Sequence, residues 1–240
     1  MKNVLFLLLL LPVLTFAQKQ VINDPNAEPR SLNGSFHSIE VSHAIDLYLS
    51  QGTEEGVAIS ATDVEVRNHI KTSVVNGVLK IYLEGEGKWW KNAGNKKMRA
   101  YVSFQKLLKL KASGASDVYA TGAIKVQELD IELSGASDGK FGTIAADKLR
   151  IRLSGASDMT VNGGKVGDLT INASGASDFK GMDLATETCS ADASGASDIH
   201  VTVNSSLSAK ASGASSVYYR GGGSVKEMKS SGASTISRKG

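Results

Sequence analysis

The chain has 240 residues, with 27 basic and 24 acidic side chains and one cysteine, Cys189. The numbers of basic and acidic side chains are nearly equal, which argues against nucleic acid as a partner. A single cysteine excludes an intramolecular disulfide. The length is sufficient for one good-sized core.

The first 17 residues have the pattern of a secretory signal peptide. Lys2 precedes a long apolar run, and small residues lead up to a cleavage site after Ala17. A membrane anchor is the alternative interpretation, but the run is short for a span, and no later stretch is apolar enough to be one. We therefore expect an exported protein, located in the periplasm, on the outer-membrane surface or outside the cell. Residues 18–35 are an N-terminal extension, and residues 36–240 are expected to form one continuous domain.

Residues 36–112 show β patterns without a clear repeat, and are expected to form an elaborated N-terminal cap or the first rungs of a larger structure. Apolar and polar residues alternate along several short segments. Asn76-Gly77 is a strong tight-turn signal that precedes one of them. The expected strands are 45–52, 57–61, 78–83, 98–104 and 107–112, and the segment Asp63–Ile70 is a candidate short helix.

Both tryptophans of the chain stand side by side in the loop Gly87–Lys97, which is rich in glycine and lysine. Exposed aromatic rings in a basic loop can stack on sugars or anchor a protein partner. The structural alternative is a hairpin tip with one ring folded back as a lid. The candidate contact residues are Lys88, Trp89, Trp90 and Lys91.

From residue 113 onward the chain repeats one five-residue motif. "SGASD" begins at Ser113, Ser134, Ser154, Ser174 and Ser194, and is followed by "SGASS" at Ser212 and "SGAST" at Ser231. A period close to 20 residues is typical of a solenoid, in which each unit packs on its neighbours.

The segments before each motif alternate apolar and polar residues, so each is a strand with one buried face. When the copies are stacked, inward columns appear, such as Leu129, Leu149, Leu169, Cys189 and Leu207. Cys189 is thus expected to be a small buried apolar residue. Charged outward residues alternate in sign from rung to rung, as parallel in-register stacking favours. These patterns predict an all-β fold, a right-handed parallel β-helix with about 20 residues per rung over residues 113–240.

The motif itself is expected to be a corner. Glycine permits backbone angles that other residues resist, and serine and alanine are small enough to stack in a tight bend. The corner glycines are Gly114, Gly135, Gly155, Gly175, Gly195, Gly213 and Gly232.

Five aspartates close the motif and would form a row of like charges: Asp117, Asp138, Asp158, Asp178 and Asp198. Each carboxylate could accept backbone N–H or serine hydroxyl hydrogen bonds from its own or the next rung. Alternatively, the row could hold cations such as Ca²⁺. We favour the first explanation and expect no cofactor.

Ser42–Tyr48, "SHAIDLY", aligns with "SGASDVY" and is predicted to be a degenerate eighth copy of the motif. Together with "VSHAIDLYLSQG" and "NGVLKIYL", the repeats resemble the GIN-domain family of exported bacterial proteins, described as heads of auto-transporter adhesins. The resemblance covers residues 36–240. It implies a β-helical fold, an origin typically in Bacteroidetes and no established biochemical activity. Where the family pattern has glycine, this chain has His43.

Nothing in the sequence suggests a catalytic motif, and the short uniform rungs argue against a catalytic cleft. The leading hypothesis is a non-enzymatic adhesion or binding module of the cell envelope, with a glycan or a protein as partner. A polysaccharide lyase or hydrolase is one alternative, and a structural protein that self-associates into homo-oligomers is another.

Overall fold

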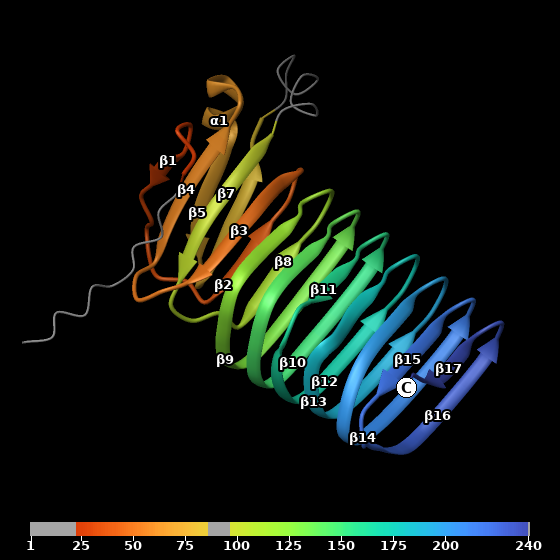
Figure 1. Ribbon diagram of the computed structural model, residues 1–240. Helices are drawn as coiled ribbons and strands as arrows, with labels where there is room; N and C mark the ends of the chain where they lie inside the picture. The colour runs from red at the N-terminus through yellow and green to blue at the C-terminus, as the bar shows by residue number, and fades with distance from the viewer. Residues whose placement is uncertain (1–22, 86–96, 240) are drawn as a thin grey trace, which may run out of the picture.

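The chain winds through about six turns of a parallel β-solenoid, with a cap of shorter strands and one helix at its N-terminal end (Figure 1). The computed structural model describes residues 23–85 and 97–239. The predicted all-β architecture and the stacked parallel strands are confirmed.

The regular coils begin with β8 and end with β17. Their strands are β8 (Lys109–Ala112), β9 (Val118–Gly135), β10 (Gly139–Gly155), β11 (Met159–Val161), β12 (Gly164–Ala173), β13 (Phe179–Ala193), β14 (Asp198–Gly213), β15 (Ser216–Arg220), β16 (Ser224–Gly232) and β17 (Thr235–Arg238). Neighbouring coils pair in parallel, and Leu129, Leu149, Leu169, Cys189 and Leu207 are register partners as predicted. β9, β10, β13 and β14 continue without a break through the second bend of the coil, whereas the chain is interrupted there between β11 and β12 and between β15 and β16.

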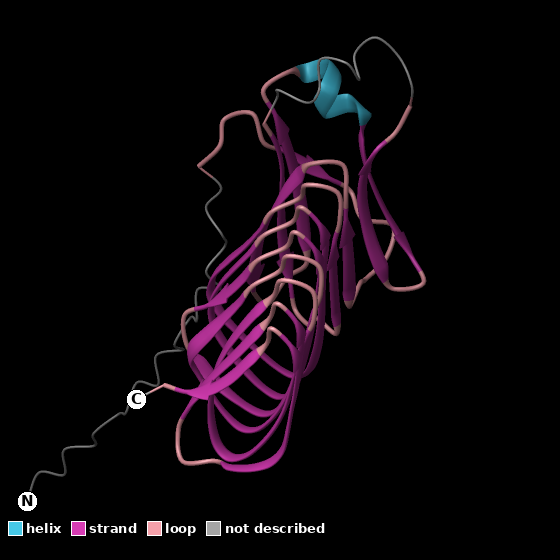
Figure 2. Cartoon of the chain, turned by 90° about the vertical axis from the view of Figure 1, so that its right-hand side faces the viewer, coloured by secondary structure: helices cyan, strands magenta, loops and turns pink. Residues whose placement is uncertain are grey.

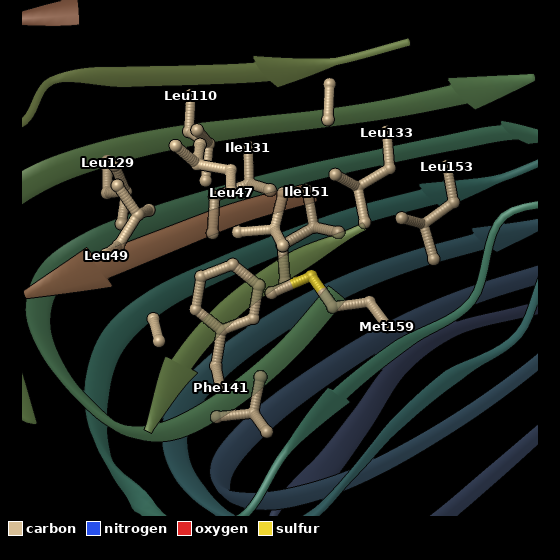
Figure 3. Close-up of a cluster of buried hydrophobic side chains, with 14 of the residues drawn as sticks. Leu47, Leu49, Leu110, Leu129, Ile131, Leu133, Phe141, Ile151, Leu153 and Met159 are labelled. Atoms are coloured by element: carbon tan, nitrogen blue, oxygen red, sulfur yellow. The ribbon is translucent and has the colours of Figure 1, made fainter. Parts of the chain in front are cut away.

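The core is a set of apolar columns that run along the solenoid axis (Figure 3). Ile131 and Ile151 stack in one column, and Leu133 and Leu153 in the next, all at most 1% exposed. Phe141 fills the space that Gly139 leaves, since a Cβ at Gly139 would come within 2.9 Å of the Phe141 ring. A missing side chain in one column is thus compensated by a large one from the same coil.

The cap strands are β1 (Glu28–Arg30), β2 (Ser38–Val41), β3 (Ile45–Gln51), β4 (Gly56–Ala61), β5 (Ile70–Val75), β6 (Val78–Leu83) and β7 (Met98–Phe104). The order in space differs from the order in sequence. β2 lies between β6 and β8, and β3 lies between β7 and β9, all in parallel. The coil formed by β2 and β3 therefore stacks directly on the first regular coil. The segment between β3 and β8 covers the other side of that coil and ends in antiparallel pairs.

Local signals in the cap sequence are confirmed. The helix α1 (Val64–His69) has Asp63 as its N-cap, whose side chain accepts a hydrogen bond from the backbone N–H of Glu65. Asn76 and Gly77 both have positive φ, at 52° and 73°, and the strand after them spans Val78–Leu83 as predicted. The predicted strand at 98–104 coincides with β7.

The last coil is more exposed than the others. In β16, Val225 and Met228 occupy the inward columns of Leu207 and Ala209, yet they are 39% and 47% exposed. No described strand pairs with their outer side. The core therefore ends in apolar side chains that reach solvent.

Candidate functional site

The corners of successive coils lie one above another and form a straight row (Figure 2). All seven motif glycines have φ between 74° and 83°, as the corner interpretation requires. At Gly155 a Cβ would also lie 2.5 Å from the carbonyl oxygen of Gly135 in the preceding coil. The backbone N–H of Ala156 donates to that same oxygen at 2.8 Å. The glycine thus permits both the left-handed turn and the close approach of the coils.

The second serine of each of the first five motifs is fully buried, and these serines form a ladder of hydrogen bonds. The Ser137 hydroxyl oxygen accepts a hydrogen bond from the backbone N–H of Ser116 in the coil before it, at 3.1 Å. The Ser177 hydroxyl accepts in the same way from Ser157, at 3.2 Å. Each of these contacts gives one buried backbone N–H group at the corner a polar partner inside the core, which explains why a hydroxyl is present there.

The aspartates form a second ladder that runs in the opposite direction. The Asp138 carboxylate accepts from the backbone N–H of Asp158 in the next coil at 3.1 Å, and Asp158 accepts from Asp178 at 2.9 Å. Asp117 and Asp178 accept equivalent hydrogen bonds from the next coil. These are the contacts that the first explanation of the aspartate row requires, and hydrogen bonds to an ionised acceptor are strong.

The predicted eighth copy takes its place in both ladders. Ser116 Oγ accepts from the backbone N–H of Ile45, and the Asp46 carboxylate accepts from the backbone N–H of Asp117. Burial raises the pKa of Asp46, and the neighbouring charge of Asp117 adds to this effect. His43 stands at the glycine position with φ 67°. A Cβ at Gly114 would still be 3.5 Å from the His43 backbone nitrogen, so this first corner is less tightly stacked than the later ones.

Beside the aspartates runs a line of outward side chains, one from each coil, which we call the outer row. Its members are register partners on the cap and on the coils: Tyr101, Tyr48, Tyr119, Lys140, Thr160, Lys180, His200 and Tyr218. Neighbours are about 4.8 Å apart along such a ladder. The place of Tyr101 in the row could not be found from the sequence, because its register depends on the non-sequential position of β7.

The first part of the outer row is a stack of three tyrosines. The Tyr48 ring lies 5.1 Å from Tyr101 and 5.0 Å from Tyr119, with interplanar angles of 26° and 19°. The Tyr119 hydroxyl donates to Asp117 at 3.1 Å. Burial, the charge of Asp117 and this hydrogen bond raise the pKa of Tyr119 to about 12. Because the rings stack on one another, they present edges and hydroxyl groups rather than open faces to a ligand.

The second part of the outer row is cationic and aromatic. The Lys180 ammonium lies 3.8 Å from the Asp178 carboxylate and 4.0 Å from that of Asp158. His200 and Tyr218 are in ring contact at 4.8 Å, and the Lys239 ammonium lies 4.2 Å above the Tyr218 ring. The row therefore offers ammonium, carboxylate, hydroxyl and imidazole groups at one regular spacing.

Neither the cysteine nor the other potential metal ligands of the described residues form a reactive or metal-binding group. Cys189 is buried, and burial raises its pKa to about 12, so it belongs to the core. Within residues 23–85 and 97–239, no three His, Cys, Asp or Glu side chains are grouped so as to hold a metal ion. In the same part of the chain, no helix is long and apolar enough to cross a membrane.

Lys88, Trp89, Trp90 and Lys91 lie outside the described residues, so their role stays a prediction. The strands on either side of that loop, β6 and β7, pair with β2 and β3, whose connection is the first corner.

Solved structures with this fold are known. The chain resembles a putative adhesin from Bacteroides fragilis with a TM-score of 0.80 at 20% identity, over 89% of this chain and 96% of that one. A putative lipid binding protein from Parabacteroides distasonis matches with a TM-score of 0.66 at 18% identity, over 90% of this chain and 98% of that one. A putative adhesin from Parabacteroides merdae matches with a TM-score of 0.69 at 16% identity, over 90% of this chain and 98% of that one. At these identities the likeness concerns the fold alone.

No curated protein sequence matches the chain significantly. Residues 35–223 match one protein family, and the match includes the eighth copy and six of the seven motifs. The chain therefore belongs to the family described as "Putative auto-transporter adhesin, head GIN domain".

Proposed function

We propose that this protein is a non-enzymatic, exported adhesion module of the cell envelope, and that the outer row is its contact surface. The observation that carries the proposal is the unbroken row of polar and aromatic side chains in register along eight strands. The family described as adhesin heads is consistent with a binding role.

The chemistry of the row favours an extended polymer with many hydroxyl groups, such as a polysaccharide strand. Tyrosine hydroxyl groups are followed along the row by lysine ammonium groups and an imidazole, with carboxylates beside them, and each can make a weak contact with one unit of the polymer. Many weak contacts on one rigid ladder sum to a useful avidity, even when a single contact is marginal.

A binding assay on immobilised polysaccharides and on cell surfaces tests this proposal. We expect Lys140→Ala/Lys180→Ala to weaken binding about tenfold or more, which corresponds to about 1.4 kcal/mol. The matched control is Lys80→Ala/Lys165→Ala, which removes the same charge from exposed positions outside the row. Equal binding by both variants would show that the row is not the contact surface.

Two further measurements separate the other hypotheses. Trp89→Ala/Trp90→Ala in the same assay tests the proposed role of the tryptophan loop. Release of reducing sugar from the polysaccharide panel would favour an enzyme instead.

Self-association is a second candidate function, favoured by the exposed Val225 and Met228 of the last coil. Light scattering tests it, because mass that rises with concentration in the wild type but not in Val225→Ser/Met228→Ser would support it. A monomer at all concentrations would contradict it.

A further inference from the structure

The β ladder has a gap where the cap joins the first regular coil. In β9, residues Ile124–Glu128 pair with Ile144–Lys148 of β10. One coil further on, Ile144–Lys148 is paired on both sides, because it also contacts Gly164–Asp168 of β12. On the cap side of Ile124–Glu128, no strand of the described chain pairs. The chain leaves the solenoid after Gln51 and returns only near Gln105, so one segment of a rung is missing.

The side chain of Gln51 takes the place of a residue of a neighbouring strand in this gap. Its Oε1 accepts a hydrogen bond from the backbone N–H of Lys125 at 2.7 Å, and its Nε2 donates to the Lys125 carbonyl oxygen at 2.9 Å. Nε2 also lies 3.2 Å from the carbonyl oxygen of Gln105. A carboxamide that satisfies both backbone groups of one residue reproduces the pairing of a neighbouring strand. The edge of β9 is therefore oriented for strand addition.

A groove of about 560 Å³ lies over this edge. Leu108, which is 38% exposed, and Val126 give it an apolar lining. Lys106 and Lys125 line it as well, and neither ammonium has a carboxylate partner within residues 23–85 and 97–239, whereas the carboxylate of Glu128 already binds Lys148 at 2.9 Å. The unneutralised charge in the groove is thus positive.

We propose that this groove binds an extended acidic peptide segment of another protein, which adds as a strand beside Ile124–Glu128. Exposed sheet edges bind extended peptides through backbone hydrogen bonds, and alternate side chains provide the selectivity. The peptide lies parallel to β9, because the strands on either side of the gap, β3 and β8, both pair with β9 in parallel. It takes over the hydrogen bonds of Gln51, an apolar side chain packs on Leu108 and Val126, and carboxylates on either side meet Lys106 and Lys125. The groove is separate from the outer row, and the inference does not depend on the adhesion function.

Fluorescence anisotropy with the mature chain, residues 18–240, tests the proposal. The probe is a fluorescein-labelled peptide, Glu-Val-Glu-Val-Glu, and we expect saturable binding below about 1 mM. Lys106→Glu/Lys125→Glu should weaken binding at least about tenfold, while Lys80→Glu/Lys165→Glu, with the same charge change outside the groove, should change it less than about twofold.

Two controls address strand addition itself. A peptide of the same sequence with alternate backbone nitrogens methylated cannot complete the ladder, so it should not bind. The variant Gln51→Ala removes the competing carboxamide, so the unmodified peptide should bind it more tightly than wild type, provided that circular dichroism shows an intact fold. Absence of binding, equal binding of the methylated peptide, insensitivity to the charge reversal, or weaker binding to folded Gln51→Ala would each overturn the proposal.

Discussion

Gly155 is subject to two independent constraints, a positive φ of 83° and the carbonyl oxygen of Gly135 at 2.5 Å from a potential Cβ. A left-handed backbone costs a residue with a side chain about 1–3 kcal/mol, and the close contact adds to this cost. We therefore expect Gly155→Ala to lower the free energy of unfolding by at least about 2 kcal/mol. Urea denaturation measures the change.

The matched control is Gly122→Ala, because Gly122 has no positive φ and a Cβ there would meet nothing within 4 Å. That substitution should change the free energy of unfolding by less than about 0.5 kcal/mol. Similar losses in the two variants would mean that the stacked corner is not the source of the effect.

The Asp158 carboxylate accepts the backbone N–H of Asp178 at 2.9 Å. Asp158→Ala leaves that N–H without its acceptor, so we expect a loss of about 1–3 kcal/mol, whereas Asp158→Asn keeps an acceptor oxygen and should lose less. Thermal melts with and without Ca²⁺ distinguish the two explanations of the aspartate row. A calcium-dependent rise in the melting temperature of the wild type that disappears in Asp158→Asn would favour the cation explanation instead.

At the scale of single residues, the repeat predicted the corner and favoured hydrogen bonds to its aspartates, but it predicted neither the buried serine ladder nor the directions of the two ladders. The small residues and the glycine follow from the repeat alone. The direction of the two ladders does not, because Ser137 accepts from the coil before it and Asp138 from the coil after it. That difference depends on how each side chain leaves the corner, which one-dimensional periodicity does not contain.

At the scale of elements, a buried carboxylate is one of the contacts that hold the N-terminal segment to the cap. The side chain of Asp24 is 7% exposed, and it accepts hydrogen bonds from the Tyr101 hydroxyl at 2.8 Å and from Arg99 at 3.3 Å. Burial raises the pKa of Asp24, but hydrogen bonds from Tyr101, Ser60, Asn26 and Arg99 together outweigh it, and the net pKa is lowered. The ionised carboxylate is thus part of what fixes the segment that leads into β1.

A lowered pKa gives a stabilisation that is present above the unfolded-state pKa and is lost as the pH falls through the folded-state pKa. Asp24→Asn should therefore cost about 2 kcal/mol at pH 7, and the difference from wild type should shrink below about pH 4. Urea denaturation of both proteins at pH 7 and pH 3 measures this. If the difference in free energy of unfolding between Asp24→Asn and wild type did not depend on pH, the charge of Asp24 would not contribute to stability.

Asp46 provides a comparison of opposite sign, because its pKa is raised. Its charged form is disfavoured in the folded state, so the wild type loses stability as the pH rises through the folded-state pKa. Relative to wild type, Asp46→Asn should therefore be most favourable at pH 7 and less so at pH 3. If the stability of Asp24→Asn and that of Asp46→Asn, each relative to wild type, changed with pH in the same direction, the opposite pKa shifts of the two carboxylates would be contradicted.

The elements themselves were largely predictable, whereas their order in space was not. Strand alternation and turn signals located β6, β7 and α1 to within a residue or two. However, local patterns do not specify that β2 pairs with β6 on one side and β8 on the other, since pairing partners separated by many residues leave no periodic signal. The gap filled by Gln51 is a consequence of this insertion and was likewise not predictable.

At the scale of the whole molecule, the core becomes thinner toward the C-terminal end. One inward column runs through Ile131, Ile151 and Ile171, continues as Ala191 and Ala209, and ends at the exposed Met228. In a solenoid each coil contacts only its neighbours, so stability is approximately a sum of local terms. Coils with smaller core residues bury less apolar surface and should open more easily.

Native-state hydrogen exchange measures this gradient coil by coil. We expect the highest opening free energies in β10 and β12, where isoleucine and leucine fill the columns, lower values in β14, and the lowest in β16 and β17. The order follows from burial, because Ile151 and Ile171 are fully buried while Met228 is 47% exposed. Equal protection along all coils would mean that the solenoid opens as one cooperative unit, in which case the thinning of the core would have no local consequence.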